Sequence, residues 1–132
     1  MSDSVLERLR GRTADGREPG SDSDESDDLG CFGWLRGRHE RAVMLELRRK
    51  NGQILAVGYN WIERMEYDAG EIVLTIGGSK IIIRGRNLNT EVRPRIRLFE
   101  GLARHKVPFI QEADQSSQLQ ADKKVVVDVI EW

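Results

Sequence analysis

The stretch Glu71-Ile-Val-Leu-Thr-Ile-Gly-Gly-Ser-Lys-Ile-Ile-Ile-Arg84 decides the fold of this chain. Two runs rich in β-branched residues meet at Gly77-Gly78, and a glycine pair adopts the positive φ values of a tight primed turn at no steric cost. With these glycines as the loop, Leu74 lies opposite Ile81, and the acidic and basic ends of the stretch face each other. We therefore predict a β-hairpin with one aliphatic face and an opposite-charge pair at its open end.

A second hairpin is predicted upstream, where the alternating run 43–49 is followed by Asn51-Gly52. Asn-Gly is a strong signal for a two-residue hairpin loop with positive φ at both positions. That loop places Leu47 opposite Ala56 and divides the hairpin into two faces. One face mixes charged with apolar residues and needs partial cover from another element. The predicted core face consists of Val43, Leu45, Leu47, Ile54 and Ala56.

Further strands lie between the two hairpins. Residues 53–67 are interpreted as two strands that share a bend near Asn60, or as one long bent strand. Asp68-Ala69-Gly70 is predicted to form a three-residue hairpin loop, with its glycine in the left-handed conformation. Gly85 is a candidate β-bulge in the last strand of the central hairpin.

One α-helix is predicted after the fifth strand. Pro94 suits the first turn of a helix, and apolar residues recur at helical spacing over 96–103. Pro108 prevents the helix from continuing. The segment 107–111 is a candidate edge strand because proline donates no backbone hydrogen bond, and residues 125–130 form the final strand.

These elements define an α+β fold. The prediction is a small antiparallel β-meander of about five to seven strands with one packed α-helix. A partly closed barrel is the alternative arrangement of the same strands. The chain is 132 residues long, which suits one domain.

The first 30 residues form an acidic arm. They carry nine acidic side chains and four arginines, and the segment 15–28 offers no apolar side chain for burial. We predict that residues 1–30 are disordered, with a candidate short helix at 4–10 that begins with a capping box, and that 31–132 form a single globular domain. The serines of the arm that lie among acids, and are candidate phosphorylation sites, are Ser21, Ser23 and Ser26.

Chemistry-bearing residues are sparse. Cys31 is the only cysteine, so no intramolecular disulfide can form. We expect Cys31 to be a small buried residue rather than a nucleophile, because neither histidine lies near it in the sequence. The two histidines, His39 and His105, belong to no cluster with metal-ligand spacing. The stretch 76–80 contains glycine, serine and lysine but lacks the spacing of a phosphate-binding loop. The sequence therefore predicts a protein that is not an enzyme and that needs no cofactor.

The cellular location is predicted from what the sequence lacks. No apolar run approaches the roughly 18 residues of a membrane span, and the start of the chain lacks the basic-then-apolar pattern of a secretory signal. We expect a cytoplasmic protein with no membrane partner.

Two groups of residues are candidate partner-binding sites. Residues 80–106 carry eight basic and two acidic side chains, which strand, loop and helix can present together to an anion; alternatively, they form ion pairs or are solvated. Phe32 and Trp34 either dock on the domain or anchor a partner, because aromatic residues are enriched at interfaces. The candidate anion- or partner-binding arginines are Arg84, Arg86, Arg93, Arg95, Arg97 and Arg104.

The function predicted from these features is that of a non-enzymatic interaction domain that binds a protein partner or self-associates. The alternative is an anion- or nucleic-acid-binding domain that acts through the arginine-rich patch of strand and helix. In that alternative the acidic arm lies on the patch and masks it, and phosphorylation strengthens the contact. Nucleic acid is the less favoured ligand, because exposed aromatic residues that stack on bases are scarce.

Overall fold

The β-hairpin predicted around Gly77-Gly78 forms with the expected register. The two glycines have φ values of 55° and 86°, a conformation that glycine adopts readily. Leu74 lies opposite Ile81 on the buried face, and Glu71 lies opposite Arg84 at the open end. The prediction for this hairpin is confirmed in its register, its turn and its buried face.

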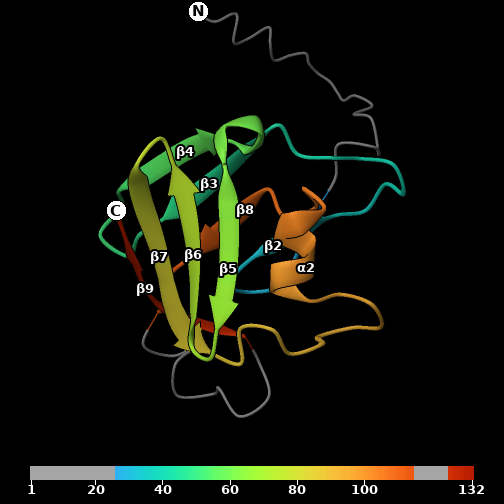
Figure 1. Ribbon diagram of the computed structural model, residues 1–132. Helices are drawn as coiled ribbons and strands as arrows, with labels where there is room; N and C mark the ends of the chain where they lie inside the picture. Colours follow the sequence, from blue (N-terminus) through green and yellow to red (C-terminus); the bar gives the residue numbers. More distant parts are fainter. Residues whose placement is uncertain (1–25, 115–124) are drawn as a thin grey trace, which may run out of the picture.

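The structure is a computed structural model that describes residues 26–114 and 125–132. These residues form a mostly-β domain of nine short strands in three sheets, with one short α-helix (Figure 1). The candidate helix at 4–10 lies outside the described residues. The elements are β1 (Ser26–Asp28), β2 (Gly33–Leu35), β3 (Met44–Arg48), β4 (Ile54–Gly58), the 3₁₀ turn η2 (Tyr59–Trp61), β5 (Arg64–Asp68), β6 (Glu71–Ile76), β7 (Ser79–Arg86), α2 (Leu98–Ala103), β8 (Phe109–Gln111) and β9 (Val126–Glu131).

The strands divide into sheets differently from the prediction. The largest sheet has the antiparallel order β5-β6-β7-β9, and a second sheet has the order β4-β3-β8, in which β8 runs parallel to β3. β1 and β2 form the third sheet. The predicted continuous meander is interrupted at η2, where the chain leaves the sheet of β4 and enters that of β5. The described strands do not close into a barrel.

The loop of the β3–β4 hairpin is longer than predicted. It contains Lys50 as well as Asn51-Gly52, and it is closed by a hydrogen bond from Arg49 N–H to Gln53 O at 2.8 Å. Within the loop only Gly52 has a positive φ, of 95°. The side chain of Asn51 instead accepts a hydrogen bond from Gln53 N–H at 2.9 Å. The predicted two-residue loop is therefore wrong.

The longer loop shifts the register of this hairpin by one residue. Leu47 lies opposite Leu55 instead of Ala56. Because neighbouring residues of a strand point to opposite faces, this shift moves every side chain of β4 to the other face. The prediction that Val43, Ile54 and Ala56 belong to the core is wrong, because all three are exposed.

Two further predictions concern the turn between β5 and β6 and the bulge in β7. Asp68 pairs with Glu71, so the predicted three-residue loop is the two-residue loop Ala69-Gly70, in which Gly70 has the expected left-handed φ of 88°. Gly85 lies at a register shift between β7 and β9, which confirms the predicted bulge. A Cβ atom on Gly85 would lie 1.9 Å from the carbonyl oxygen of Val126, so the close approach of the two strands requires glycine.

The α-helix is shorter than predicted because Pro94 does not begin it. Pro94 and Arg95 form a tight turn closed by a hydrogen bond from Ile96 N–H to Arg93 O at 2.9 Å, and Arg95 has a φ of 68°. Helix α2 begins only at Leu98. Its place after β7 agrees with the prediction, since β3 to β7 are the five predicted strands.

Strand pairing begins before the predicted domain boundary. Ser26 lies opposite Leu35 in the β1–β2 pair, although residues 1–30 were assigned to the disordered arm. Residues 26–28 of the predicted arm thus form a strand, and residues 1–25 lie outside the described residues.

The hydrophobic core lies between the two larger sheets and α2 (Figure 1). Alternate residues of each strand enter it, and full burial of an aliphatic side chain contributes about 1.5–3 kcal/mol. Tyr67 of β5 contacts Phe99 of α2 with ring centroids 5.8 Å apart, which places the helix beside the edge of the largest sheet. The core residues of the main elements are Leu45, Leu47, Ile72, Leu74, Ile81, Ile83, Leu98, Leu102 and Ile130.

Candidate functional site

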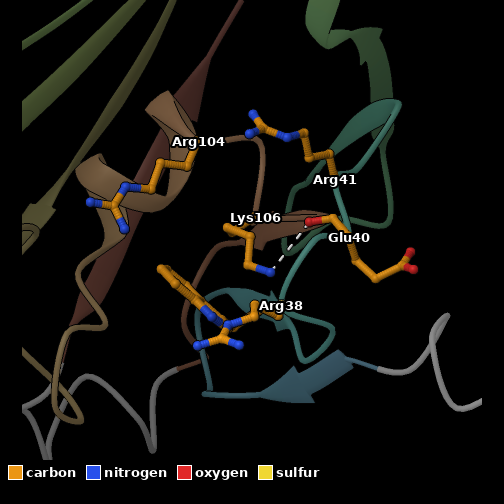
Figure 2. A pocket seen from close by; sticks show the side chains of 6 residues that line it. Arg38, Glu40, Arg41, Arg104 and Lys106 are labelled. Atoms are coloured by element: carbon orange, nitrogen blue, oxygen red, sulfur yellow. Dashed lines mark hydrogen bonds between the residues drawn. The ribbon is translucent and has the colours of Figure 1, made fainter.

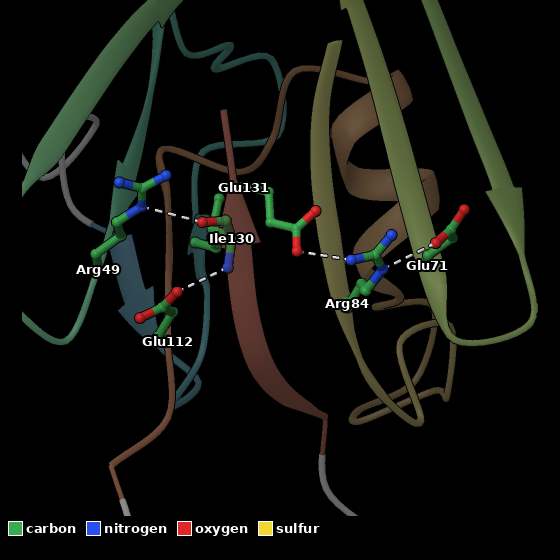
Figure 3. A network of polar contacts seen from close by, with 6 residues as sticks. All are labelled: Arg49, Glu71, Arg84, Glu112, Ile130 and Glu131. Carbon is green, nitrogen blue, oxygen red and sulfur yellow. Dashed lines mark hydrogen bonds and ion pairs between the residues drawn. The ribbon is translucent and has the colours of Figure 1, made fainter.

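The six arginines of the predicted anion-binding set are distributed over three places. On the exposed face of β7 and β9, Arg84 pairs with Glu71 at 3.2 Å and with Glu131 at 2.6 Å (Figure 3). Arg86 pairs with Asp128 at 3.4 Å. These carboxylates neutralise the positive charge of both arginines.

Arg93 lies at the second place, beside β1. Its guanidinium pairs with one carboxylate oxygen of Asp27 at 3.2 Å, and Arg36 pairs with the other oxygen at 2.7 Å. The hydrogen bond from Arg36, together with the charges of both arginines, lowers the pKa of Asp27. Arg93 therefore connects β1 to the loop that precedes α2.

The remaining arginines, Arg95, Arg97 and Arg104, lie together around α2. They line a surface pocket of about 440 Å³ with Glu91 and Glu100. Glu91 also accepts a hydrogen bond from Arg95 N–H at 2.7 Å. The structure thus brings together half of the predicted set, and it places two acidic side chains among these three arginines.

Arg104 also lines a second pocket, which was not predicted from the sequence. We call it the basic pocket. It has a volume of about 340 Å³ and lies between the loop 36–41, which follows β2, and the C-terminal end of α2 (Figure 2). Both segments are rich in basic residues, but their separation along the chain gives no sign that they meet. The residues that line the basic pocket are Trp34, Arg38, Glu40, Arg41, Arg104 and Lys106.

Two backbone hydrogen bonds join the walls of the basic pocket. Leu35 N–H donates to Lys106 O at 2.8 Å, and Ala42 N–H donates to His105 O at 2.7 Å. His105 has a φ of 59°, and its ring stacks on that of Tyr59 with centroids 4.4 Å apart. The end of α2 is therefore held firmly against the loop 36–41.

The ammonium group of Lys106 lies within the turn of that loop. Its Nζ donates hydrogen bonds to Gly37 O and, at 3.3 Å, to Glu40 O. Burial lowers the pKa of Lys106; the charge of Glu40 opposes this shift and that of Arg41 adds to it. Figure 2 shows that the carboxylate of Glu40 points away from Lys106.

The two aromatic residues near the start of the domain, Phe32 and Trp34, lie in different surroundings. Phe32 has 0 % exposure, and it forms a β-bridge with Ile110. Trp34 is half-buried against α2, where a Cβ atom on Gly101 would lie 2.4 Å from its indole ring. Phe32 is thus a core residue, and Trp34 lines the basic pocket.

An exposed apolar surface follows strand β4, and we call it the apolar stripe. Ile54 is 60 % exposed and Trp61 is 74 % exposed. Met44 and Ala56 are exposed on the same face of the β3–β4 hairpin. Trp61 lies beside Gly58, since a Cβ atom there would be 2.7 Å from the indole Cδ1. The correct register would have been needed to find this surface from the sequence.

The only cysteine of the chain, Cys31, lies in the hydrophobic core. Cys31 is buried, as predicted, and its Sγ accepts a hydrogen bond from Val127 N–H at 3.3 Å. Burial raises the pKa of its thiol. This environment disfavours the thiolate, which is the nucleophilic form.

In residues 26–114 and 125–132, no three His, Cys, Asp or Glu side chains gather as a metal site, and no helix is long and apolar enough to cross a membrane. Comparison of the chain with protein-family models, curated proteins and solved structures found no match.

Proposed function

We propose that this protein is a non-enzymatic interaction domain that self-associates by pairing strand β4 with β4 of a second copy. The observation that carries the proposal is the edge of β4. This strand is the last one in the order β4-β3-β8, and it carries no charged residue. An edge strand without charged residues is a template for pairing with another chain.

The backbone groups of β4 support this pairing. Arg49 N–H bonds to Gln53 O and Tyr59 N–H bonds to Val43 O, which sets the alternation of hydrogen bonds along the hairpin. In an antiparallel ladder, alternate residues direct their N–H and C=O groups to the same neighbour. The backbone groups of Ile54, Ala56 and Gly58 therefore face away from β3 and can bond to an added strand.

The two edges of the largest sheet, β5 and β9, are protected. β5 carries the charged residues Arg64, Glu66 and Asp68, which disfavour pairing. On β9, Ile130 N–H donates to the carboxylate of Glu112 at 2.7 Å, and Ile130 O accepts from Arg49 Nε at 3.0 Å. β4 has neither form of protection.

The side chains of β4 are complementary to those of a second copy. In an antiparallel pair centred on Ala56, this residue lies opposite itself, and Ile54 lies opposite Gly58. Trp61 lies beside Gly58, so Ile54 of one copy reaches the exposed indole ring of the other. The pairing buries apolar side chains from both copies without placing like charges together.

The test is the oligomeric state of the full chain, measured by sedimentation equilibrium over a range of concentrations. We expect a concentration-dependent dimer. Ala56→Lys should raise the dissociation constant at least tenfold, because two lysines would lie opposite each other at the centre of the interface. Ala69→Lys is the matched control, since it makes the same change at an exposed turn between β5 and β6.

A monomer at the highest accessible concentration contradicts self-association. So does a dimer that Ala56→Lys and Ala69→Lys weaken equally. Native-state circular dichroism of both variants checks that neither substitution unfolds the domain.

A further inference from the structure

We propose that the basic pocket binds a phosphoryl group. Three arginines and one lysine line it, and the carboxylate of its one acidic residue, Glu40, points away from Lys106 (Figure 2). The planar fork of arginine matches the oxygen atoms of a phosphoryl group, and lysine adds a point charge. The proposal is separate from self-association through β4, and it concerns other residues.

In the described residues, the arginines of the basic pocket are not paired with carboxylates. Within residues 26–114 and 125–132, Arg38, Arg41 and Arg104 form no ion pair. Like charges gathered in one pocket repel one another, and a bound anion removes this repulsion. The arginines that do pair with a carboxylate are Arg36, Arg48, Arg64, Arg84, Arg86 and Arg93.

Lys106 is held in place for this role. Its Nζ already donates to the backbone oxygens of Gly37 and Glu40, and an ammonium group has three donors. The third donor is available to a ligand. Burial lowers the pKa of Lys106, and a bound dianion would oppose this shift by stabilising the charged form.

The size of the basic pocket indicates a phosphate ester. Its volume of about 340 Å³ lies at the lower end of the range of about 300–1,000 Å³ that is usual for small-molecule sites. The indole of Trp34 forms an apolar wall beside the four cations. The site therefore has room for a phosphoryl group and for part of the organic group that carries it.

Two carriers satisfy this chemistry, a small phosphate ester and a phosphoserine of the chain's own acidic arm. Ser26 lies opposite Leu35, and Leu35 N–H donates to Lys106 O. The described chain begins with β1, and only strand β2 lies between β1 and the basic pocket. Ser23 precedes Ser26 by three positions in the sequence, which corresponds to at most about 10 Å of extended chain. The test must therefore distinguish the two carriers.

The experiment is a titration of the ¹⁵N-labelled full chain with inorganic phosphate and with adenosine monophosphate, at constant pH and ionic strength. We expect saturable shifts of the backbone amide signals of 36–41 and 104–106. The double variant Arg38→Gln/Arg104→Gln should raise the dissociation constant at least tenfold. Both side chains are exposed, so the fold should persist. The matched control, Arg64→Gln/Lys80→Gln, removes the same charge elsewhere and should bind as wild type does.

Two further full-length chains distinguish the carriers. In Asp22→Asn/Asp24→Asn/Glu25→Gln, the three carboxylates next to Ser23 cannot compete with the added ligand. In a chain with phosphoserine at position 23, the same amide shifts should appear without added ligand if the arm supplies the phosphoryl group. If a small ester supplies it, phosphoserine leaves the affinity unchanged, and adenosine monophosphate binds more tightly than inorganic phosphate.

The proposal is overturned if no phosphate, ester or phosphoserine produces saturable shifts at 36–41 and 104–106, including in the Asp22→Asn/Asp24→Asn/Glu25→Gln chain. It is also overturned if Arg38→Gln/Arg104→Gln and Arg64→Gln/Lys80→Gln bind equally well.

Discussion

The side-chain carboxylate of Glu112 accepts a hydrogen bond from the backbone N–H of Ile130 at 2.7 Å (Figure 3). Its other oxygen accepts from Lys50 N–H at 2.9 Å, and Arg49 Nε donates to Ile130 O at 3.0 Å. The guanidinium of Arg49 also lies 3.5 Å from the centre of the Trp132 ring. Glu112 and Arg49 thus connect the β3–β4 loop to β9 and satisfy polar groups on the free edge of that strand.

Replacement of Glu112 by alanine should destabilise the domain. The substitution removes two charge-assisted hydrogen bonds to backbone N–H groups, and we expect a loss of about 2 kcal/mol in the free energy of unfolding. Urea denaturation measures this loss. Glu66→Ala is the control, because the exposed pair of Glu66 with Arg64 should contribute less than about 1 kcal/mol. Equal losses in the two variants would contradict a connecting role for Glu112.

Gly85→Ala should be among the most damaging single-methyl changes in the chain. The added Cβ atom would lie 1.9 Å from Val126 O, so β7 and β9 must separate at the bulge, at a cost of about 3 kcal/mol. Gly77→Ala adds a methyl group to open space and meets only the strain of a φ of 55°, which costs about 1 kcal/mol. Thermal or urea unfolding of the two variants should show this order, and the reverse order would be inconsistent with the close approach at Gly85.

Tyr59→Phe should change both stability and its dependence on pH. The hydroxyl of Tyr59 donates to Val107 O at 2.6 Å, and its loss should cost about 1–2 kcal/mol. Burial raises the pKa of Tyr59, so the folded state keeps the phenol neutral while the unfolded state ionises above about pH 10. Wild type should therefore lose stability as the pH rises past about 10, and Tyr59→Phe should lose less. Tyr67→Phe is the control variant, because it removes a hydroxyl group from an exposed tyrosine.

The thiol of Cys31 should react slowly with a thiol reagent in the native protein. The residue is buried and burial raises its pKa, so both access and the thiolate fraction are low. The rate of reaction should rise at least a hundredfold in denaturant. A chain with Cys31→Ser and Ser79→Cys places the thiol on an exposed turn and should react rapidly in the native state. Fast labelling of wild type under native conditions would show that Cys31 is accessible.

The central hairpin could be predicted completely because its determinants are local. Gly77-Gly78 permits one tight turn, and the turn sets the register of the strands on both sides of it. The pairing of Glu71 with Arg84 follows from that register, and the structure places the two side chains 3.2 Å apart. The bulge at Gly85 was recognisable for a similar reason, since a glycine inside a strand often marks a close backbone approach.

The register of the β3–β4 hairpin could not be predicted from its turn signal. Asn51-Gly52 fits a two-residue loop as well as the observed longer loop. In the folded protein, Asn51 bonds to Gln53 N–H, and Leu55 rather than Ile54 packs against the core. The choice between the registers depends on which face of β4 the rest of the protein covers, and that information is not local.

The basic pocket could not be assembled from the sequence either. Excess positive charge was visible in two segments, but the predicted arginine set mixed residues that pair with acids, such as Arg84, with one that lines the pocket, Arg104. Their roles differ because the tertiary fold brings Glu131 to Arg84 and brings Arg38 and Lys106 to Arg104. The number of charged residues in each segment of the sequence predicts neither of these arrangements.

The sequence by itself determined the glycine-centred hairpin, the burial of Cys31, the placement of the helix after β7 and the concentration of charge in particular segments. These follow from backbone geometry and from alternation over a few residues. Only the tertiary structure decided that β4 exposes Ile54 and that Arg104 and Arg38 line one pocket, because both depend on contacts between segments far apart in the chain. The central hairpin has the same register in prediction and structure since its turn alone sets it, whereas the surfaces proposed for binding exist only when distant segments pack together.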